Sequence, residues 1–296
     1  MDPAFVAFVN TGVVPIGLAA IMFSMGLSLS LSNFVEVVRN PRAVAGGLFG
    51  QMVLMPLAAL AVITLFQLPP TMAMGLFILA ICPAGTTSNA VTYAAKANVA
   101  LAVVLTALSS IITVFTIPFL ARWGLGQFGS QGSVPDLPIL RTMQQLAQMT
   151  VLPMAVGMVL RRINPAFADR ASVWLRPAAL IVLIAVIAFS VFVSLELVLD
   201  NIVRAGPAAY VLNVVTMLLG VGVGAVLSLA PMDRLTLGIE VGIQNATMAT
   251  FLSLTVLGDI ALAITPTIYG VIMLLNALLL VRWFKWRRAR AGATAP

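Results

Sequence analysis

Glu240 is the side chain of this chain with the clearest capacity for chemistry. It alone among the nine acidic residues lies well inside an apolar run. A carboxylate in a bilayer costs several kcal/mol, so such a residue indicates an ion or proton pathway. The alternative is a protonated Glu240 that hydrogen-bonds to a neighbouring helix, and the functional interpretation is favoured over it.

Neutral side chains with hard oxygen atoms accompany this carboxylate. They are Gln51, Ser88, Asn89 and Gln244. Hard cations are bound by oxygens of this kind, and one carboxylate would neutralise one monovalent charge. The chain has no histidine and one cysteine, Cys82, which argues against a transition-metal site. The predicted cation is Na⁺, and H⁺ is its rival.

A line of hydroxyl groups adds to this oxygen set. Thr106, Ser110 and Thr113 follow one another at the spacing of one helix face. The same pattern also arises where serine and threonine mediate close packing of membrane helices. One turn before Thr106 stands Ala102, which has no side-chain oxygen to contribute.

Two polar interruptions that contain glycine lie within apolar runs, at 82–89 and 240–245. Glycine loosens a helix, so each run is expected to form two half-helices. The second halves, from Thr86 and from Asn245, would offer unpaired N–H groups to an anion. Broken segments at corresponding positions of two halves indicate the ion and substrate site of a transporter.

The composition places these segments in a lipid bilayer. Hydrophobic residues make up 61% of the chain and charged residues 8%, and the mean hydropathy is +1.10. A soluble domain would carry about a quarter charged residues. We predict an all-α integral membrane protein with nine transmembrane helices. Their predicted ranges are 5–31, 42–66, 71–96, 99–122, 141–161, 174–198, 207–229, 231–257 and 264–285.

The charged residues predict the orientation in the membrane. With the N-terminus outside, thirteen Lys and Arg residues fall on the cytoplasmic side and three outside. The net charge of +7 is therefore explained by the orientation in the membrane and does not indicate nucleic-acid binding. No basic region precedes the first run, which predicts a span and not a cleaved signal peptide. We expect a multi-pass protein of the plasma (bacterial inner) membrane, with no obligatory protein partner and a disordered basic cytoplasmic tail at 287–296.

The chain also contains an internal sequence repeat. Pro70 and Pro231 each open a broken run and stand 161 residues apart, and the segments 98–102 and 259–263 match at the same offset. The second to fourth and seventh to ninth predicted spans therefore form two copies of a three-helix unit. The predicted topology inverts one copy, so the two broken helices are expected to cross.

The motifs at these breaks resemble those of a known family. The stretches 82–101 and 240–245 are similar to two signatures of the bile acid:sodium symporter family, and the resemblance extends from about residue 14 to residue 285. It implies sodium-coupled uptake of organic anions by a single transporter domain, 1–296. It further implies a core at 42–123 and 207–286, and a panel at 5–31 and 141–198. Nine spans correspond to the family form that lacks the first of ten.

The resemblance also implies site residues. One sodium site would use Glu240, Gln244 and Gln51, with the backbone carbonyls of Val241 and Ile243. A second would use Ser88, Asn89, Thr106 and the shared Glu240, together with a serine where this chain has Ala102. The substrate would contact Thr86, Asn245 and Asn276. The Ala102 difference predicts weakened or single-ion coupling.

Two other classes remain open from the sequence. A proton-coupled carrier or exporter of the same architecture would need Glu240 but not the surrounding amide oxygens. A membrane enzyme or receptor is disfavoured, because no nucleophile–base pair, metal cluster or phosphate loop is evident in the sequence. The substrate itself stays undetermined among bile-acid-like, pantoate-like and keto-acid carboxylates.

Overall fold

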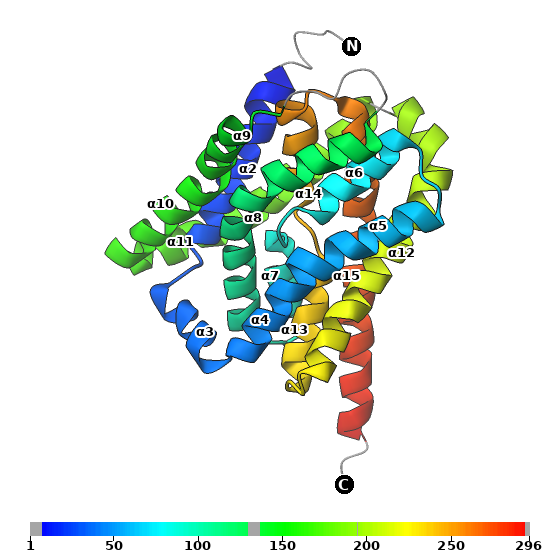
Figure 1. Ribbon diagram of the computed structural model, residues 1–296. Helices are drawn as coiled ribbons and strands as arrows, with labels where there is room; N and C mark the ends of the chain where they lie inside the picture. The colour runs from blue at the N-terminus through cyan, green and yellow to red at the C-terminus, as the bar shows by residue number, and fades with distance from the viewer. Residues whose placement is uncertain (1–7, 130–136, 194, 294–296) are drawn as a thin grey trace.

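The computed structural model describes residues 8–129, 137–193 and 195–293. Over these residues the chain forms helices joined by short connections, with one isolated β-bridge at Ala84 and Gln244 (Figure 1). An all-α architecture was predicted and is confirmed for this part of the chain. Each predicted span overlaps described helical residues, and each of the two interruptions separates a pair of short helices.

The first predicted repeat unit contains an almost continuous helix, a broken helix and a long helix. Its elements are α4 (Pro41–Phe49), a π-helical turn (Gly50–Leu54), α5 (Met55–Leu65), α6 (Pro70–Ala80), α7 (Thr86–Ala94) and α8 (Val99–Phe128). Proline stands in the first turn of α4, α5 and α6, where its missing N–H costs nothing. These prolines, each followed by an apolar stretch, explain where the helices begin.

The second unit has the same order. Its elements are α12 (Leu195–Val226), α13 (Pro231–Gly242), α14 (Ala246–Phe251), a π-helical turn (Leu252–Val256), a 3₁₀ turn (Ile260–Ala263) and α15 (Ile264–Ala293). Gln67 and Ser228, which are 161 residues apart, follow α5 and α12 with positive φ angles of 47° and 54°. Asn98 and Asp259, at the same offset, each cap the following helix through a side-chain oxygen. These matched turns support the predicted duplication.

The remaining helices lie outside the two repeat units. They are a π-helical turn (Val9–Val13), α2 (Val14–Gly26), a 3₁₀ turn (Leu31–Phe34), α3 (Val35–Arg39), α9 (Ile139–Leu146), a π-helical turn (Ala147–Val151), α10 (Leu152–Ile163) and α11 (Pro165–Val193). Figure 1 shows α2, α9 and α10 together on one side of the molecule, apart from α5, α12 and α15. Gly26 and Gly157 allow α2 and α10 to meet at backbone distance. The division into core and panel stays a prediction.

Several predicted boundaries are wrong. α11 begins at Pro165 and not at 174, and α12 begins at Leu195 and not at 207. Hydropathy marks the stretch that suits hydrocarbon, whereas a helix continues through polar residues that favour it. The tail predicted to be disordered at 287–296 instead continues α15 as far as Ala293, because alanine and arginine are strong helix formers.

Length and composition identify five helical segments among the described residues that can cross a membrane. They are Pro41–Leu65, Val99–Phe128, Ile139–Ile163, Asn201–Val226 and Ile260–Arg282. The two halves of each broken helix are too short to cross singly. A multi-pass membrane protein is therefore supported, and the number of nine crossings stays a prediction.

Candidate functional site

The two breaks cross each other at the centre of the molecule. The Gly85 N–H donates to the Ile243 carbonyl at 3.0 Å, and the Asn245 N–H donates to the Pro83 carbonyl at 3.0 Å. These bonds form an antiparallel bridge between two segments far apart in the sequence. A Cβ atom on Gly85 would lie 2.7 Å from the Gln244 carbonyl oxygen, so this close approach requires glycine.

Glu240 lies at the end of α13, immediately before the second break, and is only 2% exposed. Its carboxylate accepts a hydrogen bond from Ser88 Oγ of α7 and a second, of 2.8 Å, from Thr106 Oγ1 of α8. In the described part of the chain no Lys or Arg forms an ion pair with it. Among the described residues, this buried carboxylate thus joins three helices without a cationic partner.

Gln51 and Gln244 form a second cluster beside the break. Gln51 Nε2 donates to Gln244 Oε1 at 2.8 Å, and Gln244 Nε2 donates to Gln51 Oε1 at 3.2 Å. The same two amides also donate to the carbonyls of Cys82 and Val241. Of the residues expected to share a site, the structure therefore brings Gln51, Gln244 and Val241 together.

This second cluster is separate from the Glu240 carboxylate. No hydrogen bond between Glu240 and either Gln51 or Gln244 occurs among the described residues, and the Ile243 carbonyl is engaged by Gly85. Gln51 reaches the break from a π-helical turn, a feature frequent at functional sites. The expected oxygen atoms thus form two clusters at the break, one around the Glu240 carboxylate and one around the Gln51–Gln244 pair.

Asn89 and Ala102 bear on the second predicted ion site. Asn89 Oδ1 is buried and has no hydrogen-bond partner in the described structure, which leaves an acceptor oxygen on the residue that follows Ser88 in the sequence. Ala102 is fully buried on α8, and its backbone carbonyl lies 3.0 Å from Thr106 Oγ1. The hydroxyl that the resemblance predicts at position 102 has no substitute among the side chains bonded to Glu240.

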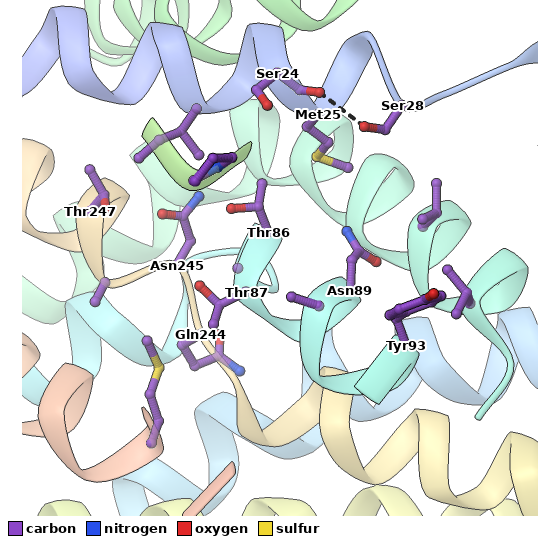
Figure 2. A pocket seen from close by; sticks show the side chains of 18 of the residues that line it. Ser24, Met25, Ser28, Thr86, Thr87, Asn89, Tyr93, Gln244, Asn245 and Thr247 are labelled. Atoms are coloured by element: carbon purple, nitrogen blue, oxygen red, sulfur yellow. Dashed lines mark hydrogen bonds between the residues drawn. The ribbon is translucent and has the colours of Figure 1, made fainter. Parts of the chain in front are cut away.

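A cavity of about 550 Å³ adjoins the crossing point. It is bounded on one side by the starts of the second half-helices, at Thr86 and Asn245, and on the other by Ser24 of α2 and by Ser28, which follows α2. Figure 2 shows the Thr86 and Asn245 side chains pointing towards α2. Within the described part of the chain no charged side chain lines this cavity.

Asn245 has two roles at this cavity. Its Oδ1 accepts a bond of 3.0 Å from the Met248 N–H and so caps α14. Its Nδ2 is buried without a hydrogen-bond partner among the described residues. An unsatisfied buried donor is costly, and an acceptor placed in the cavity would satisfy it.

Asn276 was predicted to contact the substrate. It is not among the described residues that line the cavity, and its Nδ2 donates to Asn213 Oδ1 at 2.7 Å. The side chain is turned between α15 and α12, where its amide finds a partner. Asn213 and Tyr269, which both donate hydrogen bonds to the Gly242 carbonyl, were not predicted from the sequence. Their polar groups inside apolar helices were the available signal.

Two crossed, broken helices that surround a buried carboxylate beside a cavity are typical of secondary transporters. The comparison with known families is consistent with this class. The family model described as "Sodium Bile acid symporter family" matches residues 15–201. The chain belongs to this family.

Individual relatives carry similar names. A "Probable sodium/metabolite cotransporter BASS2, chloroplastic" from Oryza sativa subsp. japonica is 28% identical over 257 residues, which cover 85% of this chain and 58% of the relative. The "Probable sodium/metabolite cotransporter BASS1, chloroplastic" of Arabidopsis thaliana is 28% identical, with 86% and 62% covered. This chain thus spans about six-tenths of the length of each plant protein.

A bacterial relative is covered more completely. The "Uncharacterized sodium-dependent transporter YocS" of Bacillus subtilis (strain 168) is 26% identical over 284 residues, which cover 95% of this chain and 86% of the relative. Sodium dependence is therefore named in relatives from plants and from a bacterium. None of these three names specifies a substrate beyond a metabolite.

Proposed function

We propose that the protein is a sodium-coupled symporter that takes up an organic anion by alternating access. The observation that carries this proposal is the environment of Glu240. Its carboxylate is buried, is bonded only by hydroxyl groups from α7 and α8, and has no cationic side chain beside it in the described structure. A buried charge requires a compensating charge, and a transported cation supplies one.

The residues around the break fit a sodium ion. Glu240, Gln244 and Gln51 would provide side-chain oxygens, and Val241 and Ile243 would provide backbone carbonyls. Ser88, Asn89 and Thr106 would provide the neutral oxygens of the second position, where the unpartnered Asn89 Oδ1 is the clearest free ligand. Neutral oxygens with a single carboxylate suit a hard monovalent cation.

The cavity fits an organic anion. Its volume of about 550 Å³ lies within the range of small-molecule sites, roughly 300–1,000 Å³. Thr86 begins α7 and Asn245 caps α14, so the positive ends of two helices face the cavity. With the unpartnered Asn245 Nδ2, they would hold a carboxylate of bile-acid-like, pantoate-like or keto-acid type.

Adjacent positions in the chain couple the two ligands. Ser88 of the cation cluster stands two residues after Thr86, and Gln244 immediately precedes Asn245. A cation that orders Ser88 and Gln244 therefore also orders the two donors that face the anion. Sodium need not touch the anion, because it only has to favour the arrangement that binds it.

The position of the cavity indicates the access state. Its lining includes Ser28, Tyr93 and Val99, which lie at helix ends predicted to be cytoplasmic. We infer that this conformation opens towards the cytoplasm, with the N-terminus outside and the C-terminus inside. Motion of the proposed panel, which includes α2, against the proposed core, which includes α7 and α14, would change access across the plasma membrane.

A proton-coupled carrier is the second candidate. The observation in its favour is the reciprocal pairing of Gln51 and Gln244, which occupies the amide oxygens that sodium would need. Glu240 with its two hydroxyl partners could then carry a proton alone.

Uptake by the protein in liposomes separates the two candidates. A radiolabelled organic anion, identified by its stabilisation of the purified protein, is offered under an inward sodium gradient without a pH gradient, and under the reverse combination. Sodium-driven accumulation supports symport. Accumulation that follows only the pH gradient would show that the coupling ion is a proton and not sodium.

A further inference from the structure

The Gly242 carbonyl, freed from helical bonding by the break, is held by two side chains from other helices. Asn213 Nδ2 of α12 donates to it at 2.7 Å, and the Tyr269 hydroxyl of α15 donates to it at 2.7 Å. Asn213 Nδ2 also donates to the Tyr269 oxygen at 3.0 Å. Both side chains are fully buried, so this is a complete polar network inside an apolar bundle.

The three carbonyls of the break face two different sides. The Val241 carbonyl accepts from Gln244 Nε2, and the Ile243 carbonyl accepts from the Gly85 N–H. Both partners belong to the crossing point, whereas the partners of the Gly242 carbonyl belong to α12 and α15. Because the Gly242 carbonyl and the Ile243 N–H belong to one planar peptide unit, fixing this carbonyl also fixes the amide through which the Ile243 N–H bonds the Ile239 carbonyl. Holding Gly242 therefore keeps Val241 and Ile243 turned towards the crossing.

Asn276 completes this network. Its Nδ2 donates to Asn213 Oδ1 at 2.7 Å, which leaves the Asn213 amide nitrogen for Gly242 and Tyr269. Asn276 thus determines which end of the Asn213 amide faces the break. This contact explains a polar residue on α15 that does not line the cavity.

α12 packs closely against α13 and the break that follows it. A Cβ atom on Gly242 would lie 2.1 Å from Met217 Cγ, and one on Gly220 would lie 2.4 Å from the Leu237 carbonyl oxygen. These contacts leave no room for a side chain between α12 and α13. The donors on α12 therefore stay in register with the carbonyl they hold.

We propose that Asn213 and Tyr269 are positioning residues for the cation site, and that Asn276 acts through Asn213 and not on the substrate. The inference rests on the proposed sodium symport. Without the hydrogen bonds from Asn213 and Tyr269, the Gly242 peptide can adopt more orientations. Cation binding must then restrict these orientations. Sodium affinity should fall, while the anion site at Thr86 and Asn245 keeps its geometry.

The test compares Tyr269→Phe with Tyr210→Phe in liposomes. Tyr269→Phe removes only the hydroxyl group, and Tyr210 is an exposed tyrosine on α12 that serves as the matched control. We expect Tyr269→Phe to raise the half-saturating sodium concentration about threefold to tenfold, the effect of losing one buried hydrogen bond. The anion KM at saturating sodium and the maximal rate should stay within about twofold. Tyr210→Phe should match the wild type.

Asn276→Ala provides a second variant should Tyr269→Phe fail to fold. It should raise the half-saturating sodium concentration about twofold to fivefold and leave the anion KM unchanged. The inference is overturned if both folded variants keep the wild-type sodium dependence, if only the maximal rate falls, or if Asn276→Ala raises the anion KM alone. A wild type without sodium dependence would overturn the proposed function itself, so the two failures are distinguishable.

Discussion

Thr106 Oγ1 lies 2.8 Å from the carboxylate of Glu240 and donates a hydrogen bond to it. This contact connects α8 of the first repeat unit with α13 of the second. It also places the hydroxyl one helical turn after Ala102, whose carbonyl contacts the same oxygen. The ion chemistry of the proposed site therefore depends on a helix that is not itself broken.

Thr106→Val should weaken sodium binding. Valine has nearly the shape of threonine but lacks the donor, and a hydrogen bond to a charged group contributes about 1.5–3 kcal/mol. The half-saturating sodium concentration for uptake should rise about tenfold or more. Thr116→Val, on the same helix but not bonded to Glu240, should leave it unchanged. An unaltered sodium dependence in Thr106→Val would remove Thr106 from the ion site.

Ala102→Ser should add an ion ligand. The wild type is expected to couple one sodium per anion, with a Hill coefficient near one and electroneutral transport of a monovalent anion. A second sodium would carry one net charge, which adds about 2.3 kcal/mol of driving force per 100 mV. Uptake by Ala102→Ser should then become steeper in sodium and sensitive to voltage. A wild type that already shows a Hill coefficient near two would contradict the single-ion interpretation.

Gln51 and Gln244 should be energetically coupled. Replacing either one by leucine leaves the other amide buried with a lost partner, at a cost of about 1–3 kcal/mol. The double variant leaves no buried amide without its partner, so its loss of stability should be smaller than the sum of the two single losses. Thermal unfolding of the purified proteins in sodium-free buffer measures this cycle. Strict additivity would show that the reciprocal amide bonds contribute nothing.

Gly85→Ala should damage the crossing point. The added Cβ would meet the Gln244 carbonyl oxygen at 2.7 Å, and backbone cannot move aside as a side chain can. We expect a loss of stability of about 1–3 kcal/mol and a marked loss of uptake. Gly126→Ala on α8 is the control, because nothing lies within 4 Å of its added carbon. Full activity of Gly85→Ala would show that the breaks need not touch.

The sequence predicted the parts of the fold that depend on unusual residues. Glycine and amide side chains within an apolar run indicate a break in the helix. The structure brings the breaks at Gly85 and Gly242 together. Glu240, Ser88 and Thr106 also meet as expected. A buried carboxylate demands polar partners, and the chain offers few at the same depth.

The parts that were missed depend on packing. The pairing of Gln51 with Gln244 depends on a π-helical turn, for which the sequence carries no clear signal. The amide of Asn276 turns towards Asn213 because α12 lies against α15, a contact invisible in either helix alone. Helix ends such as Pro165 and Leu195 were misplaced because hydropathy reports lipid contact and not helical geometry.

The most direct test of the account is the sodium response of Glu240→Gln. Purified wild-type protein is melted in sodium and in choline buffers of equal ionic strength, beside Glu240→Gln and the control Asp259→Asn, which alters an exposed carboxylate. A bound ligand stabilises by mass action, so sodium at 100 times its Kd should add about 2.7 kcal/mol. Sodium should specifically raise the Tm of the wild type and of Asp259→Asn, and should leave the Tm of Glu240→Gln unchanged. A Glu240→Gln protein that keeps the full sodium response would contradict the account.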